Sequence, residues 1–292
     1  MNEIKKLVIP VAGYGTRFLP FTKSIPKEML PIVDRPVIQY IVEEAVAAGI
    51  KDIVLITGYS KRAIEDYFDY NIELENLLEK SGKTAQKELI RQVSDIASFT
   101  YVRQKEQLGT GHALLQLKHL LGNEPFIMVS GDDLYAGTPS RIQRLKDAYE
   151  KYNCPALITM ERSAPSDYDR YGYLKVAAEL EPGIMEVTDV IEHPGFANAP
   201  SSHASFIGYV LTPDIFPLLE KTKPRPKGEI YVTDAINDLA HQQKVIAVSG
   251  DGLHFHDCGD KLEYLKTVAE FALQREDVGA AFREHLKKLL AD

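Results

Sequence analysis

Short apolar segments alternate with helix-like segments through the first half of the chain, and this alternation constrains the fold more than any other feature. Apolar runs typical of strands span 7–11, 53–57, 99–103 and 126–130, and amphipathic patterns typical of helices span 36–48, 60–68, 111–121 and 140–152. Strands that alternate with helices predict an α/β fold with a doubly wound, mostly parallel sheet. Such a sheet binds its ligands at the carboxyl ends of its strands.

The second half of the chain is richer in strand-like segments. Apolar runs predict strands over 156–160, 172–176, 185–191 and 205–211, with a loop over 195–203. The polar segment 73–97 predicts helix on the outside of the fold, and 260–290 predicts one or two closing helices. We therefore expect a single domain over 1–292, made of one half over 1–153, a smaller β-rich half over 154–258 and closing helices over 259–292.

The charge balance excludes one broad class of function. The chain carries 34 lysines and arginines against 42 aspartates and glutamates, a net charge of −8. A general nucleic-acid binder needs a basic surface to neutralise phosphates, so we expect no nucleic-acid partner. An acidic protein can still bind phosphates where a few cations gather in one cleft.

The remaining composition is typical of a cytoplasmic protein. Cys154 and Cys258 lie far apart and form no CxxC motif, which predicts two reduced cysteines. No apolar stretch approaches the roughly 20 residues that span a bilayer, and the first residues show no signal region. We expect no membrane partner.

A glycine-containing loop follows the first expected strand. Gly13 and Gly15 would let backbone N–H groups approach an anion closely, although a tight turn is the structural alternative. The loop lacks the Gly-Lys-Ser/Thr of a Walker A motif. Phe18 stands where a dinucleotide fingerprint has its third glycine, which disfavours a nicotinamide oxidoreductase.

Two cations make this loop a stronger candidate for phosphate binding. Arg17 lies within it and Lys27 follows it, in a stretch stiffened by prolines at 20, 26, 31 and 36. A stiff loop that presents arginine and lysine above a strand end suits a triphosphate. Lys23 could play the same part, but we favour Lys27 because the proline-stiffened segment holds it in place.

Two further patterns could bind metal ions. Asp132 and Asp133 end the apolar run 126–130, where a carboxylate beside a phosphate loop is a natural Mg²⁺ ligand. His254 and His256 would share one face of a strand and could bind zinc, but no third or fourth ligand is evident in the sequence. We therefore interpret the two histidines as packing or solvent-contacting residues.

A set of ordered motifs makes the chain similar to a known family. The chain resembles the bacterial UTP–glucose-1-phosphate uridylyltransferases, which are sugar nucleotidyltransferases, in segments 13–20, 26–32, 103–109, 131–133, 171–172, 228–236 and 257–261. These segments occur in the family's order and cover nearly the whole chain. Any one of them could be accidental, whereas the ordered set is highly specific.

The resemblance implies a fold, a reaction and a set of site residues. The fold would be the Rossmann-like nucleotidyltransferase fold, with a nucleotide-binding first half and a sugar-phosphate-binding second half. The reaction would join UTP and glucose 1-phosphate into UDP-glucose and pyrophosphate, with Mg²⁺ as cofactor, in a homodimer or homotetramer. The implied residues are Arg17 and Lys27 for catalysis, Ala12, Gly13, Gly15, Gln104 and Gly109 for the nucleotide, Gly172, Glu192 and His193 for the sugar phosphate, and Asp132 and Asp257 for the metal.

One departure from the family pattern concerns the sugar phosphate. The family usually has lysine where this chain has His193, and Gly208 stands where the family usually has an arginine. His193 could contact the phosphate directly, or Lys175 or Lys261 could supply the charge instead. Two other functions stay open at this point: a related transferase that uses dTTP or another hexose 1-phosphate, and a paralogue that binds UDP-glucose without turnover.

Overall fold

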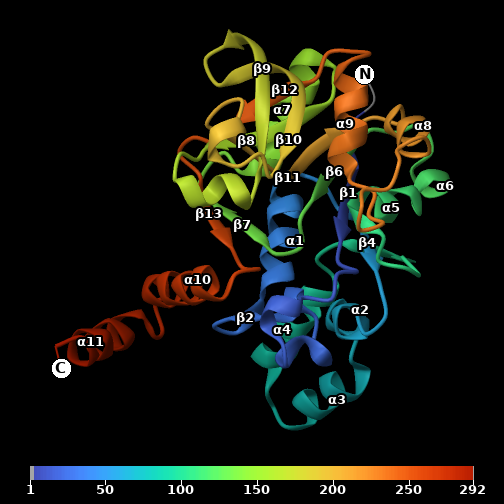
Figure 1. Ribbon diagram of the computed structural model, residues 1–292. Helices are drawn as coiled ribbons and strands as arrows, with labels where there is room; N and C mark the ends of the chain where they lie inside the picture. The colour runs from blue at the N-terminus through green and yellow to red at the C-terminus, as the bar shows by residue number, and fades with distance from the viewer. Residues whose placement is uncertain (1–2, 292) are drawn as a thin grey trace.

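A central sheet organises the protein, whose residues 3–291 are described by a computed structural model (Figure 1). Within that range the sheet has nine strands in the order β5-β4-β1-β6-β11-β8-β12-β10-β9. The first four in this order run parallel to one another. Farther along the sheet, β11 and β10 run antiparallel to all the other strands. The predicted α/β fold with a mostly parallel sheet is confirmed.

The first half supplies the parallel strands and the helices that cover them. Its strands are β1 (Lys6–Pro10), β4 (Asp52–Thr57), β5 (Ser98–Arg103) and β6 (Phe126–Val129), with a small β2–β3 pair (Pro31–Ile32, Arg35–Pro36). Its helices are α1 (Val37–Ala47), α2 (Arg62–Phe68), α3 (Ile72–Lys80), α4 (Thr84–Ser94), α5 (Gly109–Leu115), α6 (Lys118–Leu121) and α7 (Arg141–Tyr152). The expected helical excursion at 73–97 is thus two helices, separated by a turn with Gly82 at φ 68°.

Helices cover both faces of the sheet because the strand side chains alternate between two cores. Along β1, Leu7 and Ile9 pack in one buried cluster with α1 and α7. Val8 points the other way, into a second cluster that includes residues of α5, α8 (Ile215–Leu219) and α9 (Val232–Ala240). This two-sided burial is what the near-continuous apolar runs of the sequence predict for a doubly wound sheet.

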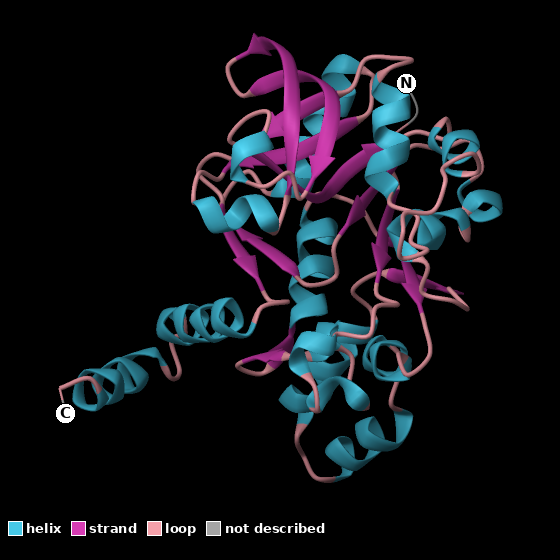
Figure 2. Ribbon diagram, in the orientation of Figure 1, coloured by secondary structure: helices cyan, strands magenta, loops and turns pink. Residues whose placement is uncertain are grey.

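The second half extends the same sheet through one shared strand. Its strands are β8 (Ala156–Glu161), β9 (Gly172–Glu181), β10 (Ile184–Glu192), β11 (His203–Leu211) and β12 (Ile246–Ser249). The end of β11 pairs with β6 of the first half, while its start pairs with both β8 and β9. Figure 2 shows the long strands gathered at one end of the molecule and helices α2 to α4 at the other.

A two-stranded ribbon beside the main sheet was not predicted. Strand β7 (Asp133–Ala136) pairs antiparallel with β13 (His254–Asp257), so Asp133 lies opposite Asp257. The two strands are short and carry polar residues, which gives them no clear apolar alternation. This ribbon brings residues that are far apart in sequence to one place.

The C-terminal segment forms two helices, α10 (Lys261–Gln274) and α11 (Gly279–Leu289). Helix α10 packs on the body through edge-to-face contacts of Tyr264 with Phe18 and of Phe271 with Tyr40. Helix α11 projects away from the body (Figure 1) and buries only Gly279 within the described range. No helix of residues 3–291 is long and apolar enough to cross a membrane.

Candidate active site

The loop after β1 folds back on itself at the carboxyl edge of the parallel strands. It contains three 3₁₀ turns, Thr16–Phe18, Phe21–Lys23 and Lys27–Met29. Gly15 has φ 64°, and a Cβ on it would lie 3.2 Å from Cβ of Lys27, so both its conformation and its packing favour glycine. Gly13 is exposed, with open space where a side chain would be. The loop therefore does more than turn the chain, because it packs Gly15 against the base of Lys27.

Lys27 and Asp132 form the central ion pair of the site. Lys27 Nζ donates a hydrogen bond to Asp132 Oδ2 at 2.6 Å, and Ser130 Oγ donates to Asp132 Oδ1 at 2.7 Å. Burial disfavours the charged form of Asp132, but Lys27 and these hydrogen bonds outweigh it and hold the pKa of this carboxyl below its ordinary value. Asp132 is therefore an anion at neutral pH, as a metal ligand must be.

A second carboxylate faces Asp132 across a glycine. Asp257 ends β13, accepts a hydrogen bond from the Gly259 N–H at 3.0 Å and pairs with Arg170 Nη2 at 2.7 Å. A Cβ on Gly259 would lie 2.4 Å from Asp132 Oδ2 and 3.1 Å from Asp257 Oδ1. The absence of a side chain at Gly259 therefore leaves a space between two converging carboxylates.

Asp133 is the carboxyl of this group that is hardest to ionise. Burial, together with the charges of Asp132 and Asp257, raises the pKa of Asp133 to about 8. Burial and the charge of Asp132 also raise the pKa of Asp257, although Arg170 opposes that shift. Crowded carboxylates of this kind favour the binding of a cation between them.

A buried ion pair lies beside Lys27, at the next residue of the chain. Lys61 Nζ donates to Glu28 Oε2 at 2.9 Å, and both side chains are almost wholly buried. The other oxygen, Glu28 Oε1, has no hydrogen-bond partner in the part of the chain that the structure describes. Sequence reasoning missed this pair, because nothing local to Lys61 indicates that it reaches the segment of Lys27.

A cavity of about 390 Å³ opens beside these groups. It collects six of the residues that the sequence predicted: Arg17, Gly109, Asp132, Gly172, Glu192 and Asp257. Residues that the sequence did not assign also line it, including Arg170, Tyr171, Tyr209, Tyr231 and Thr233. The cavity thus joins Arg17, on the loop after β1, to strands of the second half.

Glu192 and Gly172 lie together on the second-half side of the cavity. They are register partners at the ends of β10 and β9. A Cβ on Gly172 would lie 3.3 Å from Glu192 Oε2, so glycine at this position leaves room for the carboxylate. The two residues are brought together as the sequence predicted.

The residues expected at the nucleotide lie around the next strand ends. Gln104 is buried, and its Nε2 donates to the carbonyl of Gly109 at 3.2 Å. Gly109 has φ 91°, and a Cβ on it would lie 2.5 Å from the carbonyl oxygen of Ile230. Gln107, which the sequence did not assign, links this loop to the first one by donating to the carbonyl of Ala12 at 3.5 Å.

His193 lies outside the cavity lining. Its side chain is exposed and its backbone φ is 50°. Its Nδ1 is 3.1 Å from the carbonyl oxygen of Asp169. Neither Lys175 nor Lys261 lines the cavity either. The cations that line it, in the described part of the chain, are Arg17 and Arg170. Arg170 is exposed on a loop, so no strand-end pattern indicated it.

Comparison with known proteins gives a consistent family. The model of the nucleotidyl transferase family matches residues 6–274. The chain is 45% identical over 289 residues to the UTP–glucose-1-phosphate uridylyltransferase of Staphylococcus epidermidis, which covers 99% of each chain. It also matches a UDP-glucose pyrophosphorylase complexed with UDP-glucose (TM-score 0.84, 41% identity, 93% of this chain and 100% of that one).

A UTP-bound UDP-glucose pyrophosphorylase from Acinetobacter baumannii is similar over 98% of this chain and 99% of that one, with TM-score 0.90 and 38% identity. The resemblance that the ordered motifs predicted is therefore confirmed over nearly the full length. This chain belongs to the nucleotidyl transferase family and, within it, to the UTP–glucose-1-phosphate uridylyltransferases.

Proposed function

We propose that this enzyme transfers a uridylyl group from UTP to glucose 1-phosphate, giving UDP-glucose and pyrophosphate. The observation that carries the proposal is the convergence of Asp132 and Asp257 on the space beside Gly259, with Lys27 and Arg170 paired to them. Two carboxylates with flanking cations at the carboxyl edge of a parallel sheet suit a reaction between two phosphates. The names of the similar proteins support the choice of UTP and glucose 1-phosphate.

The same two carboxylates fit Mg²⁺. Mg²⁺ prefers carboxylate and phosphate oxygens, and each carboxylate oxygen keeps a lone pair beyond the hydrogen bond that it already accepts. We infer that Asp132 and Asp257 hold the ion in the space beside Gly259. When bound, Mg²⁺ would neutralise phosphate charge at the reacting centre.

The remaining chemistry needs positioning and charge rather than a general base. A sugar phosphate is largely dianionic near neutral pH, because its second pKa is about 6. Its oxygen forms a bond to the α-phosphorus of UTP while the bond from that phosphorus to pyrophosphate breaks. Lys27 and Arg17 stabilise the negative charge on the α-phosphate and on the leaving pyrophosphate.

The two substrates would contact different groups of residues, and of the nucleotide group only Gly109 lines the cavity. Gln104 and the backbone of Ala12, Gly13, Gly15 and Gly109 would hold the nucleotide, since an amide side chain offers both a donor and an acceptor to a pyrimidine edge. Gly172 and Glu192 would accept the hexose. The Thr233 hydroxyl also lines the cavity, is buried and has no protein partner among residues 3–291, so it can bond to a substrate hydroxyl.

The sugar-phosphate contact expected of His193 suits Arg170 better. Arg170 lines the cavity and is held by Asp257 at 2.7 Å, whereas His193 lies outside the lining. Guanidinium groups bind phosphate oxygens through two parallel hydrogen bonds. We therefore infer that Arg170 contacts the sugar phosphate.

We also propose that the protein is cytoplasmic and forms a homodimer or homotetramer. The two cysteines are buried and unpaired, as in a reducing compartment. Helix α11 projects from the body, and Leu289 at its end and Leu290 just after it are 61% and 83% exposed. Apolar side chains on a projecting helix suit a contact with a second subunit. Light scattering of the purified chain, with and without residues 275–292, tests this proposal.

A pyrophosphate-release assay tests the reaction. The assay would compare UTP, dTTP, ATP and GTP with several sugar 1-phosphates, in the presence of Mg²⁺. We expect turnover to be fastest with UTP and glucose 1-phosphate. A preference for dTTP or for another hexose 1-phosphate would support a related transferase instead. No turnover with any pair would contradict the proposal that the protein is an enzyme.

Two variants test the metal ligands. Asp132→Ala and Asp257→Ala should each abolish turnover while the fold is retained. Asp238→Ala, on the exposed side of α9, is a matched control that should keep full activity. Near wild-type turnover in either of the first two variants would contradict that residue's role.

A further inference from the structure

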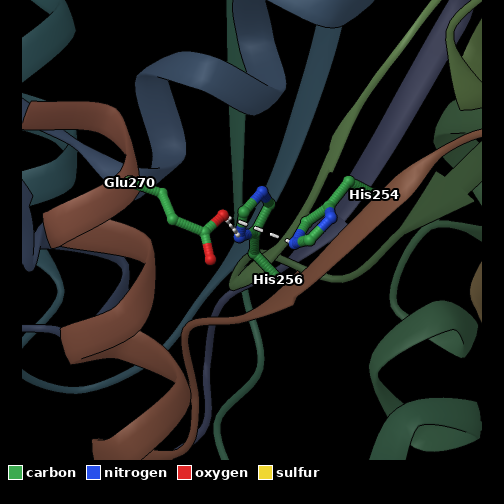
Figure 3. Close-up of side chains that lie close together, drawn as sticks. All are labelled: His254, His256 and Glu270. Carbon is green, nitrogen blue, oxygen red and sulfur yellow. Dashed lines mark ion pairs between the residues drawn. The ribbon is translucent and has the colours of Figure 1, made fainter. Parts of the chain in front are cut away.

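Three potential metal-binding side chains meet on the side of β13 that faces α10. His254 and His256 come from the strand and Glu270 comes from the helix, with one donor atom of each within 4.8 Å of the others (Figure 3). The two histidines share a face because strand side chains alternate. No sequence pattern indicated Glu270 there, so the third ligand became evident only in the structure.

The separations of the donor atoms suit a tetrahedral ion. Zinc binds histidine nitrogen at 2.0–2.1 Å and carboxylate oxygen at 2.0–2.2 Å, which places neighbouring donors about 3.4 Å apart. His254 Nε2 lies 3.4 Å from Glu270 Oε2, and His256 Nδ1 lies 4.0 Å from the same oxygen. Small rotations of the two exposed side chains would complete the geometry.

The surroundings fix one ligand and leave the other two accessible. His256 is 5% exposed and packs edge-on against Phe271. Its Nδ1 lies 3.2 Å from Thr267 Oγ1, which itself donates a shorter hydrogen bond of 2.8 Å to the carbonyl of Glu263. An ion can therefore take the place of the longer contact while the hydroxyl of Thr267 keeps its donor bond.

His254 and Glu270 are open to solvent, with side chains 63% and 45% exposed. An ion can enter from that side, and water can occupy the fourth position, as in zinc sites with three protein ligands. Two imidazoles and one carboxylate are a ligand set that favours zinc over Mg²⁺, since Mg²⁺ prefers oxygen alone.

The cluster is separate from the carboxylates of the active site. Asp257 follows His256 on β13 and therefore points to the opposite face of the strand. We propose that His254, His256 and Glu270 bind one Zn²⁺ ion, with water as the fourth ligand. The ion would join β13 to α10 and so stabilise the strand that presents Asp257.

The test measures zinc binding by untagged protein. Equilibrium dialysis against Zn²⁺, with millimolar Mg²⁺ present to occupy the active-site carboxylates, gives the stoichiometry and Kd. His254→Ala and Glu270→Ala remove the two exposed ligands and leave the buried ligand His256 in place. His241→Ala is the matched control, because His241 forms an exposed pair with Asp189 at 3.0 Å but has no third ligand of this kind among residues 3–291.

We expect one zinc ion per chain in the wild type and in His241→Ala. Loss of a direct ligand should weaken binding more than about a hundredfold in His254→Ala and in Glu270→Ala. Zn²⁺ should also raise the Tm of the wild type but not of those two variants. Absence of zinc binding in the wild type, or unchanged binding in both ligand variants, would overturn the proposal.

Discussion

Replacing Gly259 by alanine would place a methyl group between the carboxylates of Asp132 and Asp257. The added Cβ would lie 2.4 Å from Asp132 Oδ2, whereas ordinary contacts begin at 3.4 Å, so the carboxylate must move by 3.4 − 2.4 = 1.0 Å. That oxygen also accepts the 2.6 Å hydrogen bond from Lys27, so the movement disturbs both groups. A misplacement of 1 Å in a catalytic group costs about 10²-fold in rate.

We therefore expect Gly259→Ala to lower kcat about a hundredfold and to raise the Mg²⁺ concentration needed for half-maximal rate. Gly259 has no positive φ, so alanine adds no backbone strain, and any fall in Tm should come from the displaced carboxylate alone. Pyrophosphate release at varied Mg²⁺ measures the first effect, and calorimetry measures the second.

Gly82→Ala is the matched control. Gly82 has φ 68° in the turn between α3 and α4 and no neighbour within 4 Å of its missing Cβ. Alanine there should cost about 1 kcal/mol of stability through backbone strain and leave kcat unchanged. If Gly259→Ala retained kcat within threefold of the wild type, roughly the range of a neutral change, the inferred position of the metal would be wrong.

Five further variants test neighbouring groups. Lys27→Ala should lower kcat at least about a hundredfold, whereas Lys23→Ala, at an exposed position, should change kcat little. Equal losses in the two variants would reverse this assignment. Arg170→Ala should raise the KM for glucose 1-phosphate at least about tenfold, whereas His193→Ala should leave it nearly unchanged; a larger effect at His193 would restore that residue to the phosphate site. Lys61→Met should lower the free energy of unfolding by about 3 kcal/mol in urea titrations, because it leaves a buried glutamate without its partner, and an unchanged midpoint would show that the pair contributes nothing.

Sequence reasoning located the site where a local pattern carried the signal. The end of an apolar run marked Asp132, and the glycines and prolines marked the loop of Lys27, because these features follow directly from short-range backbone preferences. The family resemblance, rather than a local pattern, indicated Glu192. The apolar runs also identified eight of the nine strands that the main sheet has within residues 3–291, since two-sided burial requires such runs, whereas the four-residue strand β12 was not predicted.

The missed features depend on long-range contacts. Arg170 lies on an exposed loop and acquires its place from Asp257, which is far away in the sequence. Glu270 meets two histidines only because α10 turns back along β13. The β7–β13 ribbon is too short and polar to show an alternating pattern. None of these three could be recognised from neighbouring residues.

The position of β11 has a consequence for dividing the protein into pieces. This strand hydrogen-bonds to β6 on one side and to β8 and β9 on the other, so a cut near residue 153 would separate partners within one continuous sheet. A fragment of residues 1–153 would expose the whole edge of β6, with its backbone donors and acceptors unpaired. Such a fragment should aggregate when expressed alone and recover solubility when the complementary fragment is co-expressed, which would make this junction a usable split point for a protein-complementation reporter.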